Sequence, residues 1–277
     1  MRGPQFWLGV SLLILFIVLF IFVYFKISQP IDSSLFIVIN EKMNVPSLNF
    51  FFEWLSLYGR EYFWIPVVAL IWILGGKDSK KAALLMVIVF IIIIIVGLSL
   101  KAIYYRPRPF LSISSAIVLL PKPMDSSFPS GHALIVIGGA TVALLLLKKR
   151  YSIPLLIEAL LVSYSRIYVG LHYPFDVLGG GLLGAAIALI TYSLLYDTRL
   201  FNRLFEYIEL ALTKAKARPD DSIMIGDSLE DDFYGAMLRG IEAILVDRKD
   251  ENPSINPRIK DLRGLFNDGL IIPRIRA

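Results

Sequence analysis

The chain has 277 residues, of which 56% are hydrophobic, and its mean hydropathy is +0.67. Long apolar runs in such a composition indicate an integral membrane protein. The net charge of +5 comes from Lys and Arg residues scattered between these runs, which argues against a nucleic-acid-binding face. The absence of cysteine excludes disulfides, zinc-thiolate sites and thiol nucleophiles.

The first apolar segment runs from Phe6 to Phe25 and is long enough for a membrane-spanning helix. No small-residue cleavage site follows it, so we expect a retained anchor helix and not a cleaved signal peptide. Residues 30–58 combine aromatic residues with few charges, which is typical of an interfacial or re-entrant segment. Five further apolar segments lie at residues 61–75, 81–100, 132–147, 153–170 and 175–196. The pattern predicts an all-α, six-helix transmembrane bundle.

Positive charges outside the apolar segments indicate the orientation of this bundle. One side of a six-span arrangement carries Lys77, Lys80, Lys81, Lys148, Lys149, Arg150, Arg199 and Arg203. Because loops rich in Lys and Arg stay on the cytoplasmic side, we expect a multi-pass cell-membrane protein with both termini in the cytoplasm. Three polar islands between the apolar segments then lie on the outer face.

These islands hold unusual chemistry for membrane sequence, including the only two histidines of the chain. They consist of Lys101 with Arg106-Pro107-Arg108-Pro109, then Phe128-Pro129-Ser130-Gly131-His132, and finally Ser165-Arg166 with His172 and Asp176. Charged residues at membrane depth are costly unless they pair or face water, which favours a functional role over snorkelling to the interface.

Lys101, Arg108 and Arg166 share one natural ligand, an oxyanion such as phosphate. The Ser130 hydroxyl and the Gly131 amide would add donors at the positive end of a helix that begins near His132.

The two histidines suit nucleophilic and general acid catalysis, because one ring could attack phosphorus while the other protonates the departing oxygen. Asp176 follows His172 by four residues, so on a helix both would share a face and the carboxylate would orient the imidazole. A packed imidazole without chemistry is the alternative for either histidine alone. A two-histidine metal site is another, but no third ligand type recurs at metal spacing.

Together the three islands resemble the complete signature of the type 2 phosphatidic acid phosphatase family, over about residues 50–196. The resemblance implies a membrane hydrolase that removes the terminal phosphate from a lipid phosphate or polyprenyl pyrophosphate without a cofactor or an obligatory metal. Site roles are implied residue by residue. His172 would form a phosphohistidine, Asp176 would orient it, His132 would protonate the leaving group, and the phosphate would be held by Lys101, Arg108, Ser130, Gly131 and Arg166. Arg106 would be a flanking positive charge.

Other functions remain open on these residues. The five residues that would hold the phosphate, Lys101, Arg108, Ser130, Gly131 and Arg166, are called the cradle below. Vanadium haloperoxidases share the same cradle, although they are soluble. The phosphohistidine could also pass its phosphate to an alcohol, which would make the protein a lipid phosphotransferase. A non-catalytic anchor whose cradle binds lipid headgroups is the third alternative.

After Tyr196 the composition becomes mixed and charged, so we predict two domains, a membrane domain at residues 1–197 and a cytoplasmic α/β domain at residues 198–277. Strand-like runs at residues 222–226 and 243–246, with a helix at residues 231–239 between them, predict a β-α-β unit.

This part resembles the second half of haloacid-dehalogenase-like hydrolases, in which Asp227 and Asp232 would help to hold magnesium. The catalytic Asp-x-Asp motif of that family occurs nowhere in the chain. We therefore expect a non-catalytic remnant or docking module, in which the acidic residues favour a helix start.

Overall fold

The computed structural model describes residues 3–214, 223–238 and 242–261. The chain divides into two compact units, Met1–Phe205 and Glu206–Ala277, and each is described by itself. The helices of the first unit are α1 (Pro4–Tyr24), α2 (Gln29–Ile37), η1 (Val38–Lys42), η2 (Pro46–Leu48), α3 (Asn49–Tyr58), α4 (Glu61–Leu74), α5 (Lys77–Ile103), α6 (Pro109–Ser112), α7 (Gly131–Leu146), α8 (Lys149–Tyr168), α9 (Pro174–Leu195) and the first part of α10 (Arg199–Lys214).

Each of the six predicted apolar segments forms a helix, namely α1, α4, α5, α7, α8 and α9. Among the described residues, three helices are long and apolar enough to span a membrane by themselves: α1, α5 and α9. Residues Pro46–Tyr58 and α4 meet at a bend of 59° and would make a fourth span if counted together. The helical membrane character is thus confirmed, whereas length and composition support three or four spans.

The segment predicted to be interfacial or re-entrant forms α2, η1, η2 and α3. Aromatic contacts fix α3 against the last turn of α8, where the rings of Phe52 and Tyr168 lie 4.2 Å apart between centroids. The Tyr168 hydroxyl also donates to the Val45 carbonyl at 2.9 Å. This packing brings α3 beside the end of α8 that carries Arg166.

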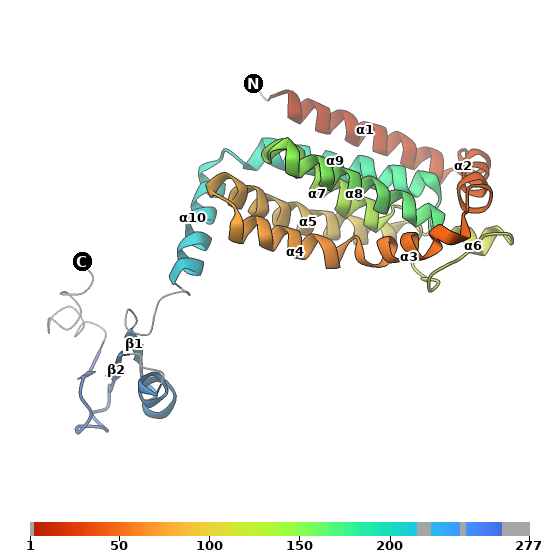
Figure 1. Ribbon diagram of the computed structural model, residues 1–277. Helices are drawn as coiled ribbons and strands as arrows, with labels where there is room; N and C mark the ends of the chain where they lie inside the picture. Colours follow the sequence, from red (N-terminus) through yellow and green to blue (C-terminus); the bar gives the residue numbers. More distant parts are fainter. Residues whose placement is uncertain (1–2, 215–222, 239–241, 262–277) are drawn as a thin grey trace. The chain divides into compact units, whose positions relative to one another are not determined.

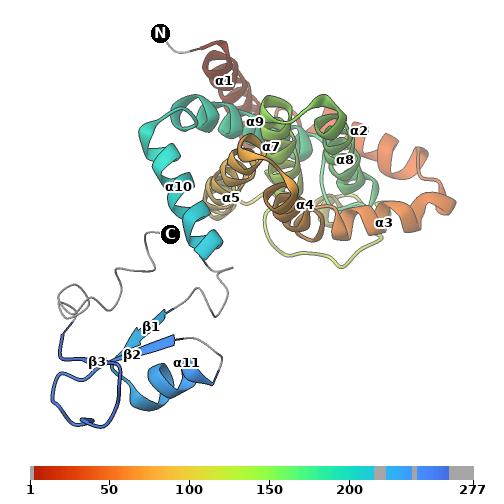
Figure 2. The same cartoon turned by 60° about the vertical axis from the view of Figure 1, so that its left-hand side comes forward.

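Helix α7 is the centre of the bundle and packs against α5, α8 and α9, while α1 covers another side of α9 (Figure 1). A turn of the view by 60° shows the same arrangement (Figure 2). The buried side chains that α7 and α9 contribute include many small ones: Ala133, Ala140, Ala143, Ala186 and Ala188. Small residues let helix backbones approach closely where no water is present to drive their association.

Two glycines of α9 show how close this approach is. A Cβ atom added at Gly184 would lie 2.3 Å from the carbonyl oxygen of Leu134, and one added at Gly180 would lie 2.5 Å from that of Ser130. Both clashing atoms belong to the backbone of α7 or its cap, so neither can turn aside. The two helices are therefore in backbone contact along this seam.

We expect Gly184→Ala to lower the thermal unfolding midpoint of the purified protein in detergent, because the helices must separate and overpacking costs about 1–3 kcal/mol. Gly181→Ala is the matched control, since its Cβ would meet only Ile137 Cγ1 at 3.7 Å. The control should leave the midpoint unchanged or raise it slightly, because alanine favours a helix. Equal midpoints for the two variants would contradict the close contact.

In the second unit, β1 (Ile223–Gly226), β2 (Glu242–Val246) and β3 (Arg258–Ile259) form a parallel sheet in the order β1-β2-β3. The connection from β1 to β2 contains η4 (Leu229–Tyr234) and α11 (Gly235–Met237), whose Phe233 and Ala236 pack on Leu245. The predicted β-α-β unit is confirmed within the described residues, with a π-helical start to its helix. Residues 222 and 239, at the predicted ends, lie outside them, and β3 was not predicted.

Candidate active site

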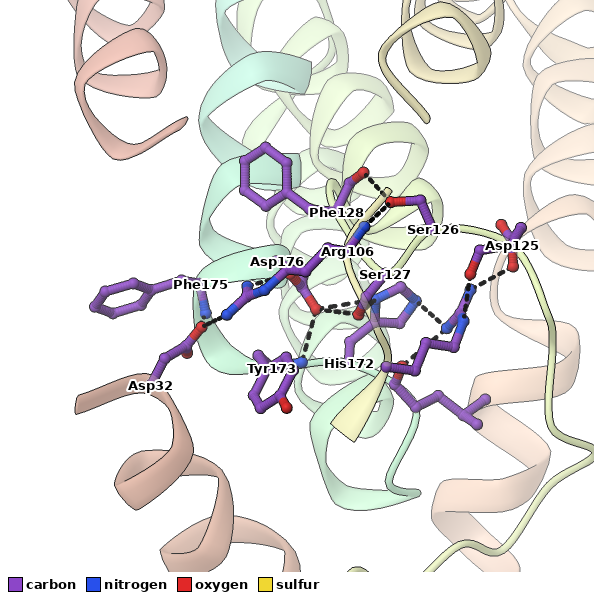
Figure 3. Close-up of polar contacts among 12 residues, drawn as sticks. Asp32, Arg106, Asp125, Ser126, Ser127, Phe128, His172, Tyr173, Phe175 and Asp176 are labelled. Atoms are coloured by element: carbon purple, nitrogen blue, oxygen red, sulfur yellow. Dashed lines mark hydrogen bonds and ion pairs between the residues drawn. The ribbon is translucent and has the colours of Figure 1, made fainter. Parts of the chain in front are cut away.

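The three polar islands meet at the end of the first unit where α2 and α6 lie (Figure 1). They are contributed by the last turn of α5, the loops around α6, the first turn of α7, the end of α8 and the start of α9. Figure 3 shows one part of this constellation, with His172 and Asp176 at its centre.

His172 lies in the loop between α8 and α9, with only 2% of its surface exposed. Its Nε2 is 3.2 Å from a terminal nitrogen of Arg108, and its Nδ1 is 3.5 Å from Oδ2 of Asp176. A guanidinium can only donate, so Nε2 accepts and the ring proton belongs on Nδ1, facing the carboxylate. Burial lowers the pKa of His172 to about 3 against the opposing effect of Asp176, with Arg108 adding to the decrease. The ring is therefore neutral, and Nε2 carries a lone pair.

The carboxylate of Asp176 also caps helix α9. Its Oδ2 accepts from the backbone N–H of Tyr173 at 2.8 Å and from the Ser127 hydroxyl, while Oδ1 accepts from Arg106 at 2.5 Å. An acidic residue in the first turn is also favoured by the helix dipole. Asp176 therefore both caps the start of α9 and contacts the imidazole of His172.

Arg106 does more than the flanking charge that the sequence predicts. It is 3% exposed, and besides Asp176 it donates to Asp32 at 2.7 Å and to Gln29 at 3.0 Å. Its guanidinium carbon lies 4.3 Å from the centroid of the Tyr173 ring. Figure 3 shows it between the two carboxylates. Arg106 therefore positions Asp176 and leaves the phosphate cradle to other cations.

Asp32 is a site residue that the sequence analysis missed. It is fully buried on α2, and its second oxygen accepts from the backbone N–H of Phe175 at 2.9 Å. This contact ties α2 to the first turn of α9. The available signal was an acidic side chain in an apolar, aromatic stretch, where buried charges need a partner.

On the other side of His172 lies a second missed residue, Asp125 (Figure 3), which forms ion pairs with Lys101 and Arg108. Its carboxylate oxygens lie 2.5 Å from Lys101 Nζ and 2.7 Å from an Arg108 nitrogen. Burial alone would raise the pKa of Asp125, but hydrogen bonds and charges from Lys101 and Arg108 lower it to about 2. The carboxylate therefore stays ionised at physiological pH. The Asp125 carboxylate thus occupies hydrogen-bond donors of Lys101 and Arg108 that a bound phosphate would use.

The remaining cradle residues present donors without partners. Ser130 Oγ and Arg166 Nε are buried and accept or donate no hydrogen bond within the described part of the chain. The other end of the Arg166 guanidinium is fixed by the carbonyl and hydroxyl of Ser56 on α3. Buried donors without partners are costly, and a bound oxyanion would satisfy them. Gly131 begins α7 beside Ser130, so its amide lies at the positive end of that helix.

Side-chain and backbone contacts bring the predicted residues into one site. Lys101 and Arg108 are linked through Asp125, Arg108 contacts His172, and His172 contacts Asp176. The backbone N–H of Ser130 donates to the Asp176 carbonyl at 3.0 Å. His132 and Arg166 both lie against Ser56. Across the described residues, no three His, Asp or Glu side chains are grouped as metal ligands.

Residues 81–200 match the model of the PAP2 superfamily. The chain is 42% identical to an undecaprenyl-diphosphatase of Sulfolobus acidocaldarius over 194 residues, which are 69% of this chain and 91% of that relative. The chain belongs to the PAP2 superfamily. Another member, the undecaprenyl-diphosphatase BcrC of Bacillus subtilis, is 31% identical over 156 residues, 56% of this chain and 80% of the relative. The predicted resemblance to this family is thereby confirmed.

Solved structures of PAP2-type enzymes share the fold. The phosphatidylglycerolphosphate phosphatase of Bacillus subtilis is 25% identical with a TM-score of 0.53, covering 72% of this chain and 96% of that one. LpxE of Aquifex aeolicus is 29% identical with a TM-score of 0.51, covering 57% and 92%. Residues 205–258 match a second model, described as HAD-hydrolase-like.

We expect Asp125→Asn to tighten the binding of orthovanadate, a phosphate analogue, by about 3- to 10-fold, because Lys101 and Arg108 lose a competing anion. Titration calorimetry of the detergent-solubilised protein measures the change. Asp78→Asn, at the opposite end of α5 from Lys101, removes the same charge away from the site and should leave the affinity unaltered. Weaker binding in Asp125→Asn would instead mean that the carboxylate holds the two cations in place.

Proposed function

We propose that this chain is a membrane-bound phosphatase that hydrolyses the terminal phosphate of a lipid phosphate or polyprenyl diphosphate through a phosphohistidine. One observation carries the proposal. The lone pair on Nε2 of His172 faces the cation cradle, while the carboxylate of Asp176 faces the N–H of the other ring nitrogen as an acceptor. Relatives named as undecaprenyl-diphosphatases and a phosphatidylglycerolphosphate phosphatase support the same class of reaction.

In the first step, Nε2 of His172 forms a bond to the terminal phosphorus as the bond from phosphorus to the lipid-side oxygen breaks. His132 gives its proton to that departing oxygen, and Asp176 stabilises the positive imidazolium that forms. Lys101, Arg108, Arg166, Ser130 and the Gly131 amide stabilise the charge on the phosphoryl oxygens. In the second step, His132 takes a proton from water, the oxygen of that water attacks phosphorus, and the N–P bond breaks to release phosphate.

The first test is phosphate release from lipid phosphates and diphosphates by purified protein in detergent with excess EDTA. We expect His172→Ala to lower the rate by about 1,000-fold or more, because the variant lacks the nitrogen on which the proposed covalent intermediate forms. With wild-type protein, quenching at short times with alkaline detergent should trap an alkali-stable phosphoenzyme that acid then hydrolyses and that the variant lacks.

Asp227→Asn is the matched control for that experiment. We infer that the C-terminal unit is a non-catalytic module, since Asp232 accepts from the Ser228 backbone at 3.2 Å and Ser228 caps η4 through Asp231. The control should therefore retain full activity. An unchanged rate of phosphate release in His172→Ala would contradict the proposed mechanism.

We further infer that all six apolar helices cross the bilayer and that the active site opens to the outer face, with both termini and the α/β module in the cytoplasm. The shorter α7 packs against α5 and α9, which supports its crossing with them. The membrane domain would end at residue 197, before α10 begins at Arg199.

The absence of native cysteine makes this topology directly testable. We expect Ser114→Cys, in the loop beside the site, to react with a membrane-impermeant maleimide in intact cells, because an outer-face loop is open to the medium. Lys149→Cys, at the first residue of α8, should react only after the cells are opened. Both native side chains are exposed, so accessibility in the fold is matched. The reverse labelling pattern would invert the proposed orientation.

A further inference from the structure

Arg60 is a cation near the site that neither the sequence motifs nor the catalytic steps above include. It lies at the bend between α3 and α4, immediately before Glu61. Its side chain is 29% exposed and forms an ion pair with Glu61, but its Nε is buried and has no partner in the part of the chain that the structure describes. The guanidinium therefore retains donor capacity beside the site.

The surroundings of Arg60 place it on one particular side of the cradle. Its terminal nitrogen lies 3.6 Å from the position that a Cβ on Gly131 would occupy. Its charge also acts on His132 and on Arg166. Lys101 and Arg108, by contrast, contact Asp125 and His172. Arg60 thus lies beside the general acid, whereas the other two cations lie beside the nucleophile.

This asymmetry matters because attack and departure occur on opposite faces of the phosphoryl group. The group that leaves must lie on the side of His132. In a lipid monophosphate, that group is an alkoxide oxygen on an uncharged lipid. In a lipid diphosphate, it is a second phosphate, which carries negative charge before the reaction and gains more as the bridging bond breaks. A guanidinium on this side has an anionic ligand only in the second case.

We propose that Arg60 binds the lipid-side phosphate of a diphosphate substrate and makes the site prefer lipid diphosphates over lipid monophosphates. This inference rests on the phosphatase function proposed above. The bond from Nε2 of His172 to the terminal phosphorus forms, the bond from that phosphorus to the bridging oxygen breaks, and the lipid monophosphate departs with the proton from His132. Arg60 stabilises the charge on the departing phosphate, and Glu61 limits the cost of an unpaired cation before substrate binds.

The test compares two substrates that differ by one phosphate, a polyprenyl diphosphate and the monophosphate of the same polyprenol. In Arg60→Gln, kcat/KM for the diphosphate should fall by about 10- to 100-fold, the usual effect of removing a charge-assisted hydrogen bond. Activity on the monophosphate should change by less than about 3-fold, which also shows that the variant is folded. Arg60→Lys keeps the charge without the fork and should lie between the two.

Lys122→Gln is the matched control, because Lys122 is an exposed cation in the loop before Ser130 and lies 5.5 Å from the Phe110 ring. It should leave the ratio of the two activities unchanged. Inhibition provides a second readout, since Arg60→Gln should weaken inhibition by inorganic pyrophosphate more than inhibition by orthophosphate.

Each result separates the two proposals. If wild type releases phosphate from both lipids and Arg60→Gln keeps their ratio, the role of Arg60 is wrong while the phosphatase function stands. An equal fall on both substrates assigns Arg60 to the common cradle and also overturns the diphosphate preference. If wild type acts on neither lipid, the phosphatase function fails and the inference fails with it.

Discussion

The carboxylate of Asp176 is the interaction on which the rest of the site depends. It is fully buried, and its two oxygens are shared among the first backbone turn of α9, the imidazole of His172, the Ser127 hydroxyl and Arg106. A buried carboxylate is tolerable only with such partners. Through them, the loop before α7, the end of α5 and helix α2 are all attached to the start of α9. The contacts that orient His172 are therefore also the contacts that fold this end of the bundle.

The polar islands could be predicted from the sequence because their residues lie at helix ends. There, a short motif contains both the helix start and the side chains of the site. Asp176 is an example, since it caps α9 four residues after the histidine it orients. Asp32, Arg60 and Asp125 could not be found in this way. Asp32 and Asp125 lie outside the motifs of their partners, as Arg106 and Asp32 are 74 positions apart and Arg108 and Asp125 are 17 apart. Arg60 forms its ion pair with the adjacent Glu61, and only the fold brings it near Gly131. Their roles arise from tertiary packing of α2, α3 and a loop without periodic sequence.

Electrostatic balance differs between the two sides of His172. Toward Asp176, each charged group in the described contacts has an ionic partner, and the single cation Arg106 lies between two carboxylates. Toward the cradle, Asp125 neutralises only part of the charge of Lys101 and Arg108, while Ser130 and Arg166 retain unpaired buried atoms. The paired side gives rigidity, and the incompletely paired side gives affinity for an anion. This division fixes His172 on one side and leaves buried donors of Ser130 and Arg166 for an anion on the other.

The close contact of α9 with α7 at Gly180 and Gly184 sets the distance between His132 and His172. His132 lies in the first turn of α7 and His172 just before α9, so the spacing of the two imidazoles follows the spacing of two helix starts. Gly180 presses directly on the Ser130 carbonyl, at the very beginning of α7. Because the contacting atoms belong to the backbone, no change of side-chain rotamer can relieve a closer approach. The backbone contacts of Gly180 and Gly184 therefore hold the starts of α7 and α9, and with them the two histidines, at one separation.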